Sequence, residues 1–265
     1  MRFIKIAHLL SFDVVCGTLA FQALLHELFL KEMPSRSEQI SLACAVWGIY
    51  LIDRMIDRKK GVLQDERHSF QSQYANLIKI IVFVLLLIGG LSLRVLDPSL
   101  IYFGLSLCFI LLIYWVLWYF GAFSRIPFSK EFMTALIYTL GVGATTWYRI
   151  PTTQRTVILG TSLFLLVLQN LIMFNAWELE EYGDTNVGWP YWKYLLIGIE
   201  VLFLLLFIVV LFYLDEKITF VPFAITFAIQ SWIHYFSKNK LASRIWGELA
   251  YCSPILYFAY EFFSK

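Results

Sequence analysis

Long apolar runs follow one another along most of the chain, and short polar segments separate them. A helix needs about 20 mostly apolar residues to cross the roughly 30 Å hydrocarbon core of a bilayer. The pattern therefore predicts an all-α polytopic membrane protein, with one domain over residues 1–265 and nine membrane-spanning helices. These helices are predicted at residues 7–30, 38–57, 76–95, 99–120, 131–149, 156–177, 192–214, 218–236 and 244–263.

The composition supports the membrane interpretation. Hydrophobic residues make up 60% of the chain, only 15% of the residues are charged, and the mean hydropathy is +0.70. A soluble domain carries about 25% charged residues and could not bury so much apolar side chain. The composition therefore argues against a cytosolic enzyme, a nucleic-acid-binding module and a disordered regulator. We expect membrane lipids around the protein and no nucleic-acid partner.

Basic residues indicate the orientation of the helices. With nine crossings, the connections at 58–75, 121–130, 178–191 and 237–243 lie on the same side as the N-terminus. This side carries 14 of the 21 Lys and Arg residues. Because basic residues favour the cytoplasmic side of a membrane, we expect the N-terminus and these connections in the cytoplasm. The expected location is a cell inner or cytoplasmic membrane.

Acidic residues gather at the end of the second predicted helix, in the segment YLIDRMIDRKKG. Asp53 and Asp57 are four residues apart and therefore share one helix face. Paired carboxylates suit Mg²⁺, which takes further ligands from phosphate oxygens and water. Basic neighbours would bind the free phosphate oxygens, and these neighbours are Arg54, Arg58, Lys59, Lys60 and Arg67. The alternative is a set of interfacial ion pairs beside a loop that is basic only because it is cytoplasmic.

A second acidic cluster, FNAWELEEYGDTNVG, follows the sixth predicted helix. Asn175, Glu178 and Glu181 are spaced i, i+3 and i+6 and fall on one stripe of a helix, with Asp184 one step further along. The acids repel one another, and the dipole at a helix C-terminus already favours cations. A bound metal ion explains the cluster better than a solvated acidic helix end does.

With these two clusters the chain resembles the UbiA superfamily of intramembrane prenyltransferases, whose nine helices carry aspartate-rich motifs after the second and sixth. The segment DRMIDRKKG is similar to the end of the first motif, with Asp53 and Asp57 on its last two aspartates. The segment NAWELEEYGD is similar to the second motif, with Asn175 and Glu178 in register. The sequence departs from the family where Tyr50 replaces the leading aspartate of the first motif. The second motif departs too, because Ala176 and Leu179 stand in place of acids. Asp184 stands one residue later than the last aspartate of that motif.

Two other segments carry the resemblance. RIPFSKEFMTALIYTLGV looks like the segment that opens the fifth helix of the family, where a lysine contacts diphosphate, and Lys130 takes that place. The resemblance thus puts Lys130 near Asp53 and Asp57. RIWGELAYCSP is similar to the start of the ninth helix, with Glu248 where aspartate is more common.

The resemblance implies a bundle with a central cavity that opens toward the cytoplasm. It also implies an enzyme that uses Mg²⁺ to transfer a prenyl group from an allylic prenyl diphosphate to a lipophilic or aromatic acceptor. The acceptor, the prenyl chain length and the oligomeric state stay open. The alternatives are a UbiA-like terpene cyclase, a transporter, and a protein that binds a lipid diphosphate without turnover.

The resemblance also assigns roles to individual residues. The expected metal ligands are Asp53, Asp57, Glu178, Glu181 and Asp184. The expected catalytic residues are Asp53, Asp57, Glu178 and Lys130. The expected substrate-binding residues are Arg58, Lys59, Arg67, Lys130, Asn175, Tyr50 and Tyr138, with Trp177 as a further aromatic residue for the cavity.

Overall fold

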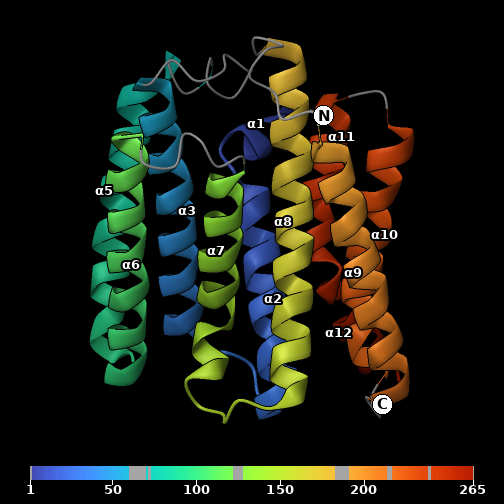
Figure 1. Ribbon diagram of the computed structural model, residues 1–265. Coiled ribbons are helices and arrows are strands. Elements are labelled where there is room, and N and C mark those ends of the chain that lie inside the picture. Colours follow the sequence, from blue (N-terminus) through green and yellow to red (C-terminus); the bar gives the residue numbers. More distant parts are fainter. Residues whose placement is uncertain are drawn as a thin grey trace.

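The computed structural model describes residues 2–59, 70, 73–121, 128–182, 191–213, 217–237 and 240–264. All regular secondary structure in these ranges is helical. The long helices lie side by side in one bundle, and successive helices run in alternating directions (Figure 1). The predicted all-helical fold class is therefore confirmed.

The helices coincide with the nine predicted runs, although the first and the last run are each divided. In chain order the elements are α1 (Arg2–Leu9), α2 (Phe12–Leu30), α3 (Arg36–Lys59), α5 (Ala75–Ser92), η1 (Leu93–Val95), α6 (Pro98–Tyr119), α7 (Ser129–Trp147), α8 (Gln154–Tyr182), α9 (Trp192–Tyr213), η2 (Lys217–Phe220), α10 (Val221–Phe236), α11 (Lys240–Leu249), η3 (Ala250–Cys252) and α12 (Pro254–Phe263).

Six of these helices are long and apolar enough to cross a membrane: α2, α3, α5 with η1, α6, α8 and α9. The other three predicted crossings form helices that are shorter or more polar. α7 has 19 residues but includes charges and threonines, α10 has 16 residues, and α11 and α12 have 10 residues each. Polar residues are tolerated in such helices where neighbouring helices cover them.

Burial separates central from peripheral helices. Within their apolar windows, α2 and α8 are each 67% buried, whereas α5 is 11% buried and α6 is 17% buried. The main core contains fully buried residues from both central helices, among them Phe21, Leu24, Leu163 and Leu166. The exposed surface of α5 and α6 is apolar, as lipid tails require. The arrangement is compatible with a multi-pass membrane protein.

The first predicted helix is interrupted, and its long straight part begins at Phe12 instead of residue 7. Ser11 adopts a left-handed conformation with φ of 59°. Trp47 Nε1 of α3 donates to the Leu10 carbonyl oxygen over 2.7 Å, and His8 Nδ1 lies 2.5 Å from Oδ2 of Asp13. The break therefore persists because α3 and a buried His–Asp pair satisfy its polar groups.

The last predicted helix is interrupted by Pro254. Proline has no N–H group, so it cannot donate to the carbonyl of Ala250 four residues earlier. The hydroxyl of Thr226 on α10 donates to this carbonyl oxygen over 2.9 Å. The break between α11 and α12 is thus stabilised by a neighbouring helix.

The two chain termini lie at opposite ends of the bundle (Figure 1). The end that carries the N-terminus also carries the last turns of α3 and α8 and the first turn of α7 (Figure 1). Asp53 lies six residues before the end of α3, and Asn175 lies seven residues before the end of α8. Both acidic clusters therefore belong to the same end of the bundle.

Candidate functional site

An ion pair joins the first acidic cluster to α7. Lys130 Nζ lies 3.0 Å from Oδ2 of Asp53, and both side chains are partly exposed. The same Nζ lies 5.0 Å from the ring centroid of Trp118, within the range of a cation–π interaction. The expected proximity of Lys130 and Asp53 is therefore found, while their roles toward a substrate stay predictions.

A hydrogen bond joins the second cluster to the same turn of α7. Asn175 Nδ2 of α8 donates to Oε1 of Glu131 over 2.7 Å. Glu131 follows Lys130 directly, so two adjacent residues of opposite charge contact α3 and α8. The first turn of α7 thus lies between the two predicted motifs and connects them.

Several predicted site residues fall outside the part of the chain whose side chains are described. They are Asp57, Arg58, Lys59, Arg67, Glu178, Glu181 and Asp184. The backbone of α8 is helical as far as Tyr182, which agrees with the i, i+3, i+6 stripe assumed for the second cluster.

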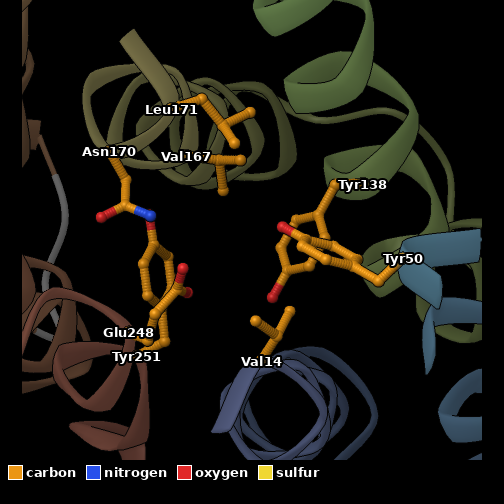
Figure 2. Close-up of a pocket in the computed structure, with 8 residues that line it drawn as sticks. All are labelled: Val14, Tyr50, Tyr138, Val167, Asn170, Leu171, Glu248 and Tyr251. Atoms are coloured by element: carbon orange, nitrogen blue, oxygen red, sulfur yellow. The ribbon is translucent and has the colours of Figure 1, made fainter. Parts of the chain in front are cut away.

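A small pocket with room for about one water molecule lies next to this polar end. It is lined by Val14 of α2, Tyr50 of α3, Tyr138 of α7, Val167, Asn170 and Leu171 of α8, Glu248 of α11 and Tyr251 of η3. Figure 2 shows Tyr50 and Tyr138 on one side and Asn170, Glu248 and Tyr251 on the other. Tyr50 and Tyr138 thus both line this pocket, while their role toward a substrate stays a prediction.

The pocket lies deeper in the bundle than the polar groups of α3, α7 and α8. Tyr50 precedes Asp53 by three residues, and Asn170 precedes Asn175 by five. At a rise of about 1.5 Å per residue, these offsets correspond to roughly 5 to 8 Å along each helix axis. A molecule with a polar head at Asp53 and Asn175 can therefore extend an apolar tail toward the pocket.

Most polar groups of the pocket wall are paired. Tyr138 and Thr18 share a hydrogen bond of 2.9 Å between their hydroxyl oxygens, and Gln230 Nε2 donates to the Tyr251 hydroxyl over 3.0 Å. Asn170 is different, because its buried Oδ1 has no hydrogen-bond partner among the described residues. A buried amide oxygen without a partner is costly, so it marks a place where a ligand would be stabilised.

Two other predicted residues have surroundings that differ from the expectation. Arg54 is buried, points Nη1 toward the Leu9 carbonyl oxygen at 3.4 Å, and lies 6.0 Å from the ring centroid of Tyr50. Trp177 packs edge-to-face on Phe174 with 5.6 Å between ring centroids and is not among the pocket-lining residues. Arg54 therefore supports the pocket wall from α3.

The sequence interpretation missed Glu131 and Asn170. Glu131 is one of two adjacent opposite charges that open an otherwise apolar helix, and this pattern is a usable signal. Asn170 belongs to the only polar pair, Gln169–Asn170, inside the apolar run LFLLVLQNLIMF. Both signals indicate helix faces that turn away from lipid.

A separate polar network surrounds Glu200 in the interior of α9. Its Oε1 accepts from Gln169 Nε2 at 3.0 Å and lies 3.1 Å from His234 Nδ1, and its Oε2 accepts from the Tyr235 hydroxyl at 2.7 Å. The network joins α8, α9 and α10. It stabilises the packing of these helices apart from the pocket, since none of its members lines the pocket.

Together, these features describe an all-helical bundle, compatible with a multi-pass membrane protein, with charged residues at one end and a small tyrosine-lined pocket behind them. Comparison with protein-family models, curated proteins and solved structures finds no match for the chain.

Proposed function

We propose that this chain is an intramembrane, magnesium-dependent prenyltransferase. The observation that carries the proposal is the first turn of α7, where Lys130 pairs with Asp53 and Glu131 pairs with Asn175 beside the pocket. Two acidic clusters that lie far apart in the sequence meet at this turn. A diphosphate between the clusters would direct its prenyl chain toward the tyrosine-lined pocket.

The proposal includes the topology expected from the sequence. All nine helical runs cross the membrane, the three less apolar ones being α7, α10 and α11 with α12. The N-terminus and the mouth of the site face the cytoplasm. Support comes from the alternating helix directions (Figure 1) and from the excess of basic residues in the segments that the sequence places on the N-terminal side.

The donor atoms at the mouth suit Mg²⁺. Asp53, Glu131 and Asn175 offer the hard oxygen ligands that this ion prefers. Within the described ranges, no three His, Cys, Asp or Glu residues form a group that could hold a metal. The proposed ligand set therefore combines Asp53 with the predicted ligands Asp57, Glu178, Glu181 and Asp184. When bound, Mg²⁺ neutralises charge on the leaving diphosphate.

The reaction breaks the bond between the allylic carbon and a diphosphate oxygen and forms a bond between that carbon and the acceptor, which loses a proton. Lys130 holds the diphosphate together with the predicted residues Arg58, Lys59 and Arg67. The ring faces of Tyr50 and Tyr138 stabilise positive charge on the allylic carbon. Burial of the pocket keeps water from capturing this carbon.

A second candidate is binding of a lipid diphosphate without turnover. The Asp53–Lys130 ion pair favours it, because a lysine already neutralises one of the expected metal ligands. Catalysis requires this pair to open, so that Asp53 binds metal and Lys130 binds diphosphate. Binding alone requires only that the diphosphate of the ligand reach Lys130. A terpene cyclase would use the same mouth but would need no acceptor.

The test is diphosphate release from labelled geranyl or farnesyl diphosphate in nanodiscs, with a panel of acceptors and mass analysis of the product. Asp53→Asn and Asp57→Asn should each lower release by orders of magnitude, because each removes one ligating charge. The matched control is Asp97→Asn. Asp97 caps α6 by accepting from the Ser99 N–H over 2.7 Å, and asparagine caps helices equally well.

Three outcomes separate the candidates. A prenylated acceptor supports the transferase, and a cyclised hydrocarbon made without acceptor supports the cyclase. Stabilisation by the diphosphate with no release above the enzyme-free rate supports binding alone. Equal stabilisation in EDTA would remove the metal from the proposal.

A further inference from the structure

A seam of polar side chains joins α2 to α7 inside the bundle. Thr18 and Tyr138 share a hydrogen bond of 2.9 Å between their hydroxyl oxygens, and Gln22 Nε2 donates to the Thr145 hydroxyl oxygen over 3.3 Å. Thr18, Gln22 and His26 follow one another at intervals of four residues, so they share one face of α2. The seam therefore leads along α2 to His26.

His26 lies at the level of Arg149, which follows α7. Residue numbers rise together in the two bonds of the seam, so α2 and α7 run in the same direction, as Figure 1 shows. Four residues beyond the contact of Gln22 with Thr145 stand His26 on one chain segment and Arg149 on the other. The Arg149 N–H donates to the Thr146 carbonyl oxygen over 3.1 Å, so the last turn of the helical path reaches it.

Arg149 joins three segments at this end of the bundle. Its Nη1 lies 2.8 Å from Oε1 of Glu32, which is 56% exposed, and its Nη2 lies 2.5 Å from Oε1 of Glu38, which is 3% exposed. The other carboxylate oxygen of Glu38 accepts from the Ser35 N–H over 2.7 Å at the start of α3. This arginine bridge, formed by Arg149, Glu32 and Glu38, holds the α2–α3 connection, residues 31–35, on the end of α7.

The ring of His26 is fully buried, and neither Nδ1 nor Nε2 has a hydrogen-bond partner among the described residues. The charged groups that act on the ring come from α3, the end of α7 and the α2–α3 connection, and they are Glu38, Arg149 and Glu32. On α8, Arg155 lies 5.3 Å from the ring centroid of Phe29, which is three residues after His26. A buried ring without a partner is tolerated while it is neutral, but a charged ring needs an acceptor.

The arginine bridge offers that acceptor. It combines one guanidinium with two carboxylates, so it has a net charge of −1 and can hold a second cation. A protonated His26 gains a second N–H donor and competes with Arg149 for Glu38, while the two cations repel each other. The site thus has two arrangements, one with a neutral ring and an Arg149–Glu38 bond, and one with a charged ring bonded to Glu38.

We infer that His26 is a proton-operated switch at the end of the bundle opposite the N-terminus. A proton from the solution, which reaches the bridge at the exposed Glu32, binds one ring nitrogen. The Arg149–Glu38 bond then breaks, an N–H···O bond from His26 to Glu38 forms, and the α2–α3 connection is released from the end of α7. The first turn of α7 carries Lys130 and Glu131, so the switch acts on the helix that connects the two acidic clusters.

The test measures the distance between the α2–α3 connection and the segment after α7 at two pH values. Spin labels are attached to cysteines at Met33 and Thr152, both exposed, in a variant without the native cysteines, and electron–electron resonance in nanodiscs gives the distance. The values are about pH 7.5 and about pH 5.0, on either side of the range in which an ordinary histidine takes up a proton. The distance should lengthen and its distribution should broaden reversibly at the lower pH. An unchanged distance would overturn the inference.

His26→Leu should keep the short distance at both pH values, because leucine does not titrate. The matched control is His234→Leu, since His234 lies 3.1 Å from Glu200 in a separate network of α8, α9 and α10. This control should retain the full response to acid. A response that persists in His26→Leu, or one that is lost equally in His234→Leu, would contradict the assignment to His26.

Arg149→Met tests the bridge itself. It removes both ion pairs, so at about pH 7.5 it should show the longer distance that the unmodified bridge shows at about pH 5.0. A short distance in this variant would refute the role of the bridge. His26→Gln covers the case in which His26→Leu does not fold, because glutamine is polar and does not titrate. The measurement needs no prenyl transfer, so the switch and the proposed function can fail independently.

Discussion

Lys130, in the first turn of α7, lies 3.0 Å from Asp53 near the end of α3, and this contact joins helices that the sequence separates by 77 positions. The next residue, Glu131, contacts α8 through Asn175. The start of α7 is thus a junction between both acidic motifs. Lys130 is paired with an opposite charge and Glu131 with a neutral amide, so each contact can be removed separately.

The Asp53–Lys130 pair should contribute little to stability. Both side chains are partly exposed, and pairs of this kind contribute about 0.2–1 kcal/mol. A double-mutant cycle with Asp53→Asn and Lys130→Met should therefore give a coupling energy below about 1 kcal/mol in thermal or denaturant unfolding. Activity should instead fall by orders of magnitude in Asp53→Asn. A coupling energy of several kcal/mol with normal activity would identify the pair as structural.

The Glu131–Asn175 bond should matter more for stability than the ion pair does. A hydrogen bond to a charged group contributes about 1.5–3 kcal/mol, and Asn175 is half-buried. Asn175→Leu should therefore lower the free energy of unfolding by roughly this amount, and Glu131→Gln should lower it by less. Chemical denaturation in mixed micelles measures both. Equal stability of Asn175→Leu and wild type would mean that the bond is not formed in the membrane.

The hydrophobic pattern was sufficient to predict where the helices lie. The described parts of the apolar runs are helical, as a hydrocarbon environment would require, because it offers backbone groups no partners other than those inside a helix. The interruption before Phe12 was not predictable, because it depends on a donor from Trp47, 37 positions away from Leu10. Hydropathy reports the surroundings of a helix, and it contains no information about side chains that reach its backbone from a distant segment.

The site was predictable only in part for the same reason. The motif resemblance placed Lys130 near Asp53, and the contact is found. Glu131 and Asn170 were not identified as site residues, because their roles depend on neighbours from other helices. An acid in the first turn of a helix is ordinarily explained by the helix dipole, and an asparagine in an apolar run is ordinarily explained by packing. The structure supplies what distinguishes them, namely the bond from Asn175 to Glu131 and the Asn170 Oδ1 in the pocket wall, which has no partner within the described ranges.

The break at Pro254 should depend on Thr226. Thr226→Val removes one of two donors to the Ala250 carbonyl, which also accepts from the Ser253 N–H over 3.1 Å, and it removes a partner of the Ser253 hydroxyl. The loss should cost about 0.5–1.5 kcal/mol. The matched control is Thr139→Val, since the Thr139 hydroxyl is buried and has no partner among the described residues. That change should be neutral or stabilising. Unfolding midpoints of the two variants test the difference, and equal effects would argue against the proposed role of Thr226.

The topology should be visible in accessibility labelling. In a variant without the four native cysteines, a cysteine at Ser264 is expected outside the cell, and a cysteine at Tyr191 is expected in the cytoplasm. A membrane-impermeant maleimide added to intact cells should therefore label only the first, and disruption of the membrane should allow labelling of both. Labelling of the Tyr191 position in intact cells would show that the orientation is the reverse of the proposed one and that the site faces the outside.

Gly17 should be essential for the close packing of α2 against η3. A Cβ atom at this position would lie 2.5 Å from Cβ of Tyr251, which cannot move without displacing η3. Gly17→Ala should therefore separate α2 from η3 and lower the free energy of unfolding by about 1–3 kcal/mol.

Gly198 of α9 provides the matched control for this prediction. A Cβ atom there meets no heavy atom within 4 Å. Gly198→Ala should raise stability slightly, because alanine restricts the unfolded chain more than glycine does. Thermal unfolding of both variants measures the difference. Equal unfolding midpoints in Gly17→Ala and Gly198→Ala would show that α2 and η3 can separate without loss of stability, so that the close approach at Gly17 does not hold them together.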